Sequence, residues 1–215
     1  MSVITISREA GSAGTQIAEE VAANLGYTLV DKQTLGTMLA KYGLISFKQV
    51  YDSVPTFWDG FDAQAADQRV SVLAMMNKAI LAIAHRGNAV IVGRGGYVVL
   101  GIYADVLNVR IQAPFSVRVK RVQEELKTAD VKLAEKDVKE RDRIRLAFMD
   151  SAYGLKAEPV SAFDIVLNTG KIDQDKAVHW IVDASLALEG GDGPRVSSIE
   201  IDPVLADVVA EIMGS

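Results

Sequence analysis

The sequence has no cysteine and only two histidines, His85 and His179, among its 215 residues. Without cysteine the chain can form no disulfide, no thiolate nucleophile and no cysteine-ligated metal centre. Two histidines are also too few for a metal site built mainly from imidazoles. These classes of site are therefore excluded before any motif is considered.

The sequence also has no long uninterrupted hydrophobic run. Its longest apolar region, residues 79–100, is broken by His85, Arg86 and Arg94, so we expect no membrane-spanning segment and no membrane partner. The first residues lead directly into the apolar run 3–6, without a basic and apolar leader. We therefore expect a soluble, cytoplasmic protein.

Charge is unevenly distributed, although the net charge at pH 7 is only −5. Residues 1–116 carry nine basic and nine acidic side chains, residues 117–145 carry ten and seven, and the remainder carries four and twelve. A general nucleic-acid-binding protein would be more basic, so we expect no nucleic-acid partner. The basic centre suits contact with a small anion, although a solvated charged helix is the alternative.

Apolar runs and helical periodicities alternate along the chain. Runs typical of buried strands occur at residues 4–6, 27–31, 89–93, 107–111 and 163–168. Helical patterns occur at residues 15–25, 34 to about 53, 70–86, 114–126, 131 to about 148 and 174–188, with a loop at 54–60. Strands separated by helices, without hairpin signals, predict an α/β fold with a parallel sheet.

The last part of the chain has a different character. Residues 189–194 have the composition of a linker, and residues 198–202 could be extended. Asp202 and Pro203 then begin a short helix whose apolar residues share one face. Such a helix needs a surface to pack on, either its own domain or a second subunit, so a homodimer is one of two outcomes.

A strand, a small-residue turn and a helix follow one another at residues 4–25. This arrangement points backbone N–H groups and a helix N-terminus at a phosphate. The full phosphate-loop motif G-x-x-x-x-G-K-[ST] is not met, however. With Thr15 at the hydroxyl position, the lysine position is Gly14, the preceding glycine is Ala13 and the first glycine is Arg8. The turn is therefore either a phosphate site without its lysine or a plain strand–helix connection.

Several stretches together resemble the cytidylate-kinase-like branch of the nucleoside monophosphate kinases. They are residues 6–14, 27–31, 90–96, 142–145 and 163–170. The resemblance covers about residues 1–188 and is coherent in order and spacing. It implies a three-layer α/β P-loop NTPase fold with a parallel sheet of about five strands and a helical lid. The acceptor segment would span about 32–86 and the lid about 127–155, with residues 189–215 as an added linker and helix.

The resemblance also implies ATP- and Mg²⁺-dependent phosphoryl transfer to a nucleoside monophosphate or a similar small acceptor. Such a reaction mainly requires that two nucleotides be positioned and that charge be neutralised. The donor phosphates would contact Arg8, Gly11, Ser12, Ala13, Gly14 and Thr15, with the Thr15 hydroxyl on the metal ion. The acceptor would contact Asp31, Gly93 and Arg94. The catalytic residues would be Arg118, Arg121, Asp142, Arg143 and Arg145.

Each of these residues also has a purely structural alternative. Thr15 could be an ordinary residue of the first helical turn, and Asp31 could cap the end of a strand. Arg121 could pair with Glu125 one turn away. The lid arginines could form a solvated face.

The sequence departs from the family pattern in ways that bear on activity. The aspartate expected after the Gly-Arg pair is Gly95, and the arginine expected after Asp31 falls at or near Thr37. Asp150 lies near the place of the last lid arginine. A second hypothesis is therefore a kinase-like module that binds nucleotide, or builds an oligomer, without transfer. The absent lysine and the absent acceptor arginine favour this module, and the retained lid arginines favour the enzyme. Nearby cations, namely Arg8, Arg118 and Arg121, could compensate for the lysine.

Overall fold

The computed structural model describes residues 2–43, 63–188 and 192–214. Five strands form one sheet in the order β2-β3-β1-β4-β5, and all neighbouring strands are parallel. Their bounds are β1 Val3–Arg8, β2 Thr28–Val30, β3 Ala89–Val92, β4 Val106–Gln112 and β5 Ile165–Asn168. The predicted α/β fold with a five-stranded parallel sheet is confirmed.

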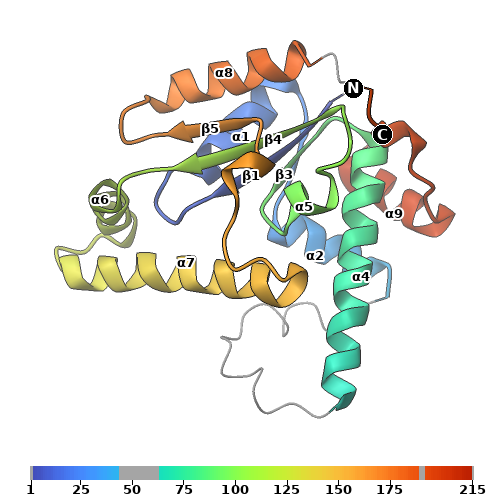
Figure 1. The fold of residues 1–215 in the computed structure, drawn as a ribbon, viewed down its shortest axis with the longest axis horizontal. Helices are drawn as coiled ribbons and strands as arrows, with labels where there is room; N and C mark the ends of the chain where they lie inside the picture. The colour runs from blue at the N-terminus through green and yellow to red at the C-terminus, as the bar shows by residue number, and fades with distance from the viewer. Residues whose placement is uncertain (1, 44–62, 189–191, 215) are drawn as a thin grey trace.

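Helices connect these strands and follow the last one (Figure 1). They are α1 Gly14–Leu25, α2 Lys32–Lys41, α4 Ala63–Arg86, α5 Gly96–Val99, α6 Phe115–Leu126, α7 Val131–Tyr153, α8 Gln174–Leu186 and α9 Pro203–Met213, with 3-10 turns at Val160–Ala162 and Val196–Ser198. Helix α5 was not predicted, because four residues are too few to show a helical period. The predicted continuation of α2 beyond residue 43 and the loop at 54–60 lie outside the described residues.

Alternation along β1 divides the core into two layers. Ile4 and Ile6 point to the face covered by α1 and α8, where they pack with Ile17 and Ile181. Val3 points to the opposite face, which α2, α4 and α9 cover. Since successive side chains of a strand face opposite sides, Thr5 and Ser7 share the face of Val3. They are the polar end of that face.

The register of the sheet brings three chain turns together at its carboxyl edge. Ile6 is paired with Val92 and Arg8 with Ile111, so the loops that follow β1, β3 and β4 start side by side. Open α/β sheets bind ligands at this edge. Helices α6 and α7 follow β4 there, packed together through a small cluster of Ala10, Val119, Val122, Ala134 and Val138.

The C-terminal helix packs on its own chain. Leu205 and Val209 of α9 are buried in the core cluster that α2 and α4 share. The side chains of Lys41 and Glu211 form an ion pair at 2.5 Å, and the Thr28 hydroxyl donates to the carbonyl of Met213 at 3.3 Å. The apolar face that could have favoured a homodimer is therefore covered within the chain.

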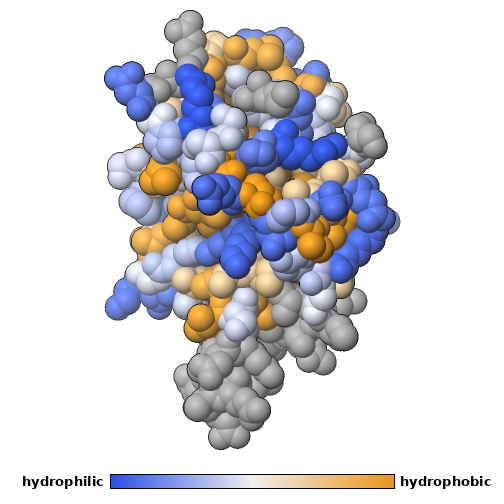
Figure 2. Space-filling model, turned by 90° about the vertical axis from the view of Figure 1, so that its right-hand side faces the viewer, coloured by the Kyte–Doolittle hydropathy of each residue, from blue (hydrophilic) through white to orange (hydrophobic). Residues whose placement is uncertain are grey.

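The expected extended segment before this helix is not a strand. Val196–Ser198 forms a 3-10 turn, and Ile199 and Ile201 pack against the same core cluster. On the side of the molecule that carries α4 and α9, apolar and hydrophilic groups are interspersed (Figure 2). Within the described residues, no helix combines the length and the apolar character needed to cross a membrane.

Candidate active site

The loop between β1 and α1 leaves the first turn of α1 without a side-chain cap. Ala13 precedes the helix with a φ of 64°, and its side chain makes no capping hydrogen bond. The Ser12 hydroxyl is buried and donates to the Glu9 carbonyl at 2.8 Å, so it closes the loop from inside. Gly11 is needed because a Cβ there would lie 2.6 Å from the Arg118 carbonyl oxygen. The loop is thus held with the N–H groups of a helix start open to a ligand.

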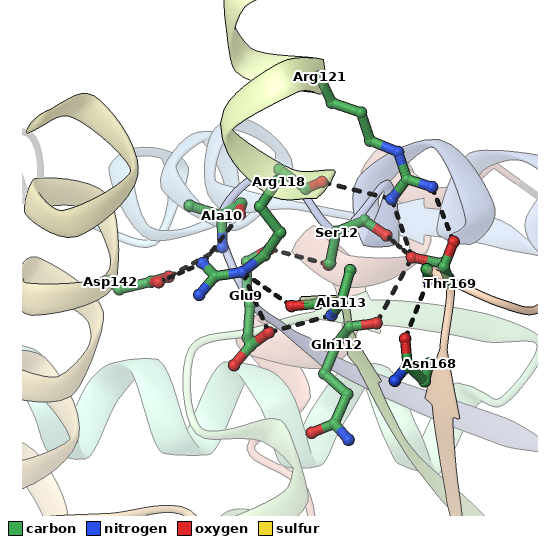
Figure 3. Close-up of polar contacts among 12 residues, drawn as sticks. Glu9, Ala10, Ser12, Gln112, Ala113, Arg118, Arg121, Asp142, Asn168 and Thr169 are labelled. Atoms are coloured by element: carbon green, nitrogen blue, oxygen red, sulfur yellow. Dashed lines mark hydrogen bonds and ion pairs between the residues drawn. The ribbon is translucent and has the colours of Figure 1, made fainter. Parts of the chain in front are cut away.

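Arg118 holds this loop from the side of α6 (Figure 3). Its Nε donates to the Ala113 carbonyl at 3.1 Å, and its Nη1 donates to the Ala10 carbonyl at 3.2 Å. The same guanidinium pairs with Asp142 at 2.6 Å and with Glu9 at 3.4 Å. Arg118 is buried and lines neither of the two cavities described below. Arg118, which was predicted to contact phosphate, is therefore bonded to the loop and its neighbours instead.

Asp142 connects α7 to the same loop. One carboxylate oxygen accepts from the Ala10 amide at 2.8 Å and from Arg145 Nη1 at 3.0 Å. The other accepts from Arg118. Asp142 thus positions two arginines and the loop, and these partners could not be predicted from its position in the sequence.

Arg121 ties the loop to the end of β5 (Figure 3). Its guanidinium donates to the hydroxyl of Thr169 at 2.9 Å and to the carbonyl of Thr169 at 2.8 Å. The Thr169 hydroxyl in turn donates to the Ser12 carbonyl at 2.8 Å. The alternative pairing of Arg121 with Glu125 does not form, because Glu125 pairs with Arg141 at 3.0 Å.

Two adjoining cavities lie at the carboxyl edge of the sheet. The larger, about 710 Å³, is lined by the loop and first turn of α1, including Gly11, Ala13, Gly14 and Thr15, and by Arg121. The smaller, about 180 Å³, is lined by residues that include Thr5, Ser7, Gly93, Arg94 and Glu158. Three arginines line both cavities and mark their boundary: Arg8, Arg141 and Arg145.

Arg8 is the most unusual of these boundary residues. Its Nε is buried, and no hydrogen-bond acceptor among the described residues reaches it. Burial, with the charges of Arg145 and Arg94, lowers the pKa of Arg8 to about 9. Gly93 passes so close to the guanidinium that a Cβ there would overlap Arg8 Nη1. The boundary therefore holds a desolvated cation with a surplus of positive charge around it, which is the environment of an anion site.

Glu158 forms part of the floor of the smaller cavity. Its carboxylate accepts from the Ser7 hydroxyl at 2.5 Å and pairs with Arg110. The Glu158 side chain is only 6% exposed, so two polar partners compensate its burial. No local motif marks this residue, since its partners come from β1 and β4.

Tyr153, the last residue of α7, contacts the turn that follows β3. Its hydroxyl donates to Asn77 Oδ1 at 2.9 Å and lies 3.2 Å from the Arg94 carbonyl. A Cβ on Gly95 would meet the Tyr153 ring. The glycine at position 95 therefore makes room for an aromatic ring.

Five predicted site residues line neither cavity: Ser12, Arg118 and Asp142, which hold the loop, and also Asp31 and Arg143. Asp31 accepts from the Thr34 amide at 2.8 Å and caps the start of α2, whereas its structural alternative was a cap at the end of the preceding strand. Arg143 is exposed and pairs with Glu140 at 2.8 Å. Consecutive helical residues point about 100° apart, so Asp142 can face the loop while Arg143 faces solvent.

The comparisons with known proteins agree with this geometry. The model of the cytidylate kinase-like family matches residues 3–171. A cytidylate kinase of Pyrobaculum neutrophilum is 30% identical over 186 residues, covering 85% of this chain and 92% of the relative. A cytidylate kinase of Ignicoccus hospitalis is 25% identical, covering 84% and 97%. A solved structure of an uncharacterised protein from Eubacterium ventriosum is similar in fold, with a TM-score of 0.66, 23% identity and coverage of 87% and 99%.

Proposed function

Because the chain belongs to the cytidylate kinase-like family, we propose that it transfers a phosphoryl group from ATP to a nucleoside monophosphate or a similar small acceptor. The observation that carries this proposal is the meeting of two cavities at Arg8, Arg141 and Arg145. Phosphoryl transfer needs two phosphate sites in line with cations between them. The boundary arginines supply that charge.

The larger cavity suits the donor. The uncapped first turn of α1 offers backbone N–H groups to the phosphates, and the buried Nε of Arg8 still needs an acceptor. The Thr15 hydroxyl lines the cavity and would hold Mg²⁺, an ion that usually takes few protein ligands besides the phosphates. When bound, this ion would neutralise charge on the donor phosphates. These residues therefore fit ATP with magnesium.

The smaller cavity suits the acceptor, with Gly93 and Arg94 at the end of β3. Residues 32–86 would form the acceptor segment, and residues 127–155 would form a lid. The contact of Asp142 with the loop would hold this lid closed and keep Arg145 at the boundary. A closed lid excludes water, which would otherwise compete as acceptor.

The alternative is a kinase-like module that binds nucleotide without transfer. The observation that favours it is Gly14 at the position of the phosphate-loop lysine. A charge-assisted contact contributes about 1.5–3 kcal/mol, so its loss alone would slow transfer by about ten- to a hundredfold.

Calorimetry with ATP–Mg²⁺ and a panel of nucleoside monophosphates, followed by an assay of ADP release, tests the proposal. We expect binding, acceptor-dependent ADP release, and a fall of about tenfold or more in kcat for Arg145→Met. Lys120→Met is the matched control, because Lys120 is exposed on α6 and lines neither cavity. Binding without ADP release for every acceptor would favour the module, and no binding at all would contradict both functions.

A further inference from the structure

Two positions of the phosphate-loop motif have exchanged their side chains in this chain. The motif has glycine where Arg8 stands and lysine where Gly14 stands. In the structure these residues touch: a Cβ on Gly14 would lie 2.5 Å from the Arg8 Cβ and 3.0 Å from its Cγ. Real Cβ atoms essentially never come closer than 3.0 Å to a non-bonded heavy atom elsewhere in the chain. A side chain at position 14 is therefore incompatible with the arginine at position 8.

Space, and not backbone conformation, is what requires glycine at position 14. Gly14 is the first residue of α1, and it is absent from the residues with positive φ, which include Gly11 and Ala13 nearby. A residue with a side chain could adopt this conformation without strain. The nearest atoms that would obstruct it belong to Arg8, with Ile111 Cβ next at 3.2 Å.

The guanidinium of Arg8 extends from the end of β1 to the boundary between the cavities. It lines both of them, and Gly93 on the adjacent strand leaves the space that its Nη1 occupies. Its buried Nε has no acceptor within the described residues. Desolvation, followed by the charges of Arg145 and Arg94, lowers the pKa of Arg8, and the charges of Glu158 and Asp31 offset this only in part.

The arginines of α6 cannot supply the same contact as they stand. Arg118 is buried, and its Nε and Nη1 are bonded to the carbonyls of Ala113 and Ala10 and to the carboxylate of Asp142. Arg121 donates to Thr169 through both of its terminal nitrogens. A phosphate would have to break these bonds, whereas Arg8 makes no hydrogen bond to a described residue that a phosphate would have to break.

We propose that Arg8 is the relocated cation of the phosphate loop, contacting the polyphosphate chain in place of a lysine from α1, and that Gly14 is the space this relocation needs. The inference rests on the proposed function for the identity of the ligand. The ligand would be a linear triphosphate. Because Arg8 lies at the boundary between the two cavities, its guanidinium would lie beside the phosphoryl group to be transferred.

Binding of inorganic tripolyphosphate and of ATP–Mg²⁺, measured by calorimetry, tests the role of the cation. We expect Arg8→Met to raise both dissociation constants by about ten- to a hundredfold. Lys120→Met, which removes an exposed cation of α6, should change them by less than about twofold. If Arg8→Met binds tripolyphosphate as tightly as the wild type, or if the wild type does not bind it, the inference is overturned.

A double-mutant cycle on thermal stability tests the exchange without any ligand. We expect Gly14→Ala to lower Tm by several degrees in the wild type and to leave it unchanged, or raise it, in an Arg8→Gly background. The doubly substituted Arg8→Gly, Gly14→Lys protein restores the usual motif residues at both positions. It should bind tripolyphosphate more tightly than Arg8→Gly alone. Equal costs of Gly14→Ala in both backgrounds would refute the steric exchange.

The two proposals fail in distinguishable ways. If the wild type transfers phosphate and Arg8→Met matches it in binding and transfer, the relocated cation is wrong and the kinase function stands. If tripolyphosphate binding depends on Arg8 but no acceptor yields ADP, the relocated cation stands and the transfer function is wrong.

Discussion

Two arginines lie on opposite sides of the same loop, and their surroundings differ. On the side of α6 and α7, the buried Arg118 meets the carbonyls of Ala10 and Ala113 and the carboxylates of Glu9 and Asp142. On the side of the sheet, Arg8 is half-buried, and its buried Nε has no acceptor among the described residues. The main difference between the two is the supply of acceptors.

This difference distinguishes Arg118, which holds the loop in place, from Arg8, which is available to bind a ligand of the loop. A buried charge that is fully paired keeps a structure in one arrangement, and removing one partner is costly. A buried charge without acceptors lowers the stability of the ligand-free protein, and this cost is offset only when an anion binds. Substitution on the two sides should therefore change stability in opposite directions.

The largest effect is expected on the paired side. Arg118→Met would remove one donor from each of two carboxylates and two carbonyls, and we expect the free energy of unfolding to fall by about 2–4 kcal/mol. Urea unfolding measures it. The exposed Lys120→Met on the same helix should change it by less than about 0.5 kcal/mol. Similar values for the two variants would remove the contrast.

A smaller effect is expected where α7 meets the loop. Asp142→Ala removes the acceptor for the Ala10 amide and for two arginines, and we expect a loss of about 1–3 kcal/mol. Hydrogen exchange in α7 should become faster, because its link to the loop is lost. Asp137→Ala is the matched control, since it removes only a partly exposed ion pair with Arg141 on the same helix. Unchanged exchange in Asp142→Ala would show that other contacts hold α7.

The smallest effect, of opposite sign, is expected on the sheet side. Arg8→Met removes a half-buried charge for which the described residues provide no hydrogen-bond acceptor at Nε, so we expect the free energy of unfolding to stay constant or to rise by up to about 1 kcal/mol at neutral pH. The pKa of Arg8 is lowered from 12.5 to about 9, so between these values the unfolded chain binds more protons than the folded one. The wild type should gain stability relative to the variant as pH rises above about 9. A variant markedly less stable than the wild type would show that Arg8 holds the fold.

Local patterns in the sequence were sufficient to predict the α/β fold and its strands. The apolar runs at 89–93 and 107–111 were predicted as strands, and β3 and β4 lie there. A helical pattern was predicted at 174–188, and α8 begins there, with Asp173 accepting from the Asp175 amide at 3.0 Å as its N-cap. Such features depend on neighbours in the chain, so a single sequence contains them.

The partners of the site residues could not be predicted in the same way. The i, i+3 spacing of Arg118 and Arg121 puts them on one helix face but does not say that one meets Asp142 and the other Thr169. Glu158 lines the smaller cavity and is bonded there to Ser7 of β1 and Arg110 of β4, which lie far from it in the sequence. These contacts form only when distant segments of the chain pack together, so the spacing of residues in the sequence does not predict them.

The close approach of Gly14 to Arg8 also restricts the routes by which this sequence could change. A lysine cannot be gained at position 14 while the arginine is present, and the arginine cannot be gained while a lysine is there. Any mutational path between the two arrangements must first lose one cation and pass through a protein with neither. On our proposal that intermediate binds its ligand weakly, so selection for binding would keep a lineage in whichever arrangement it already has.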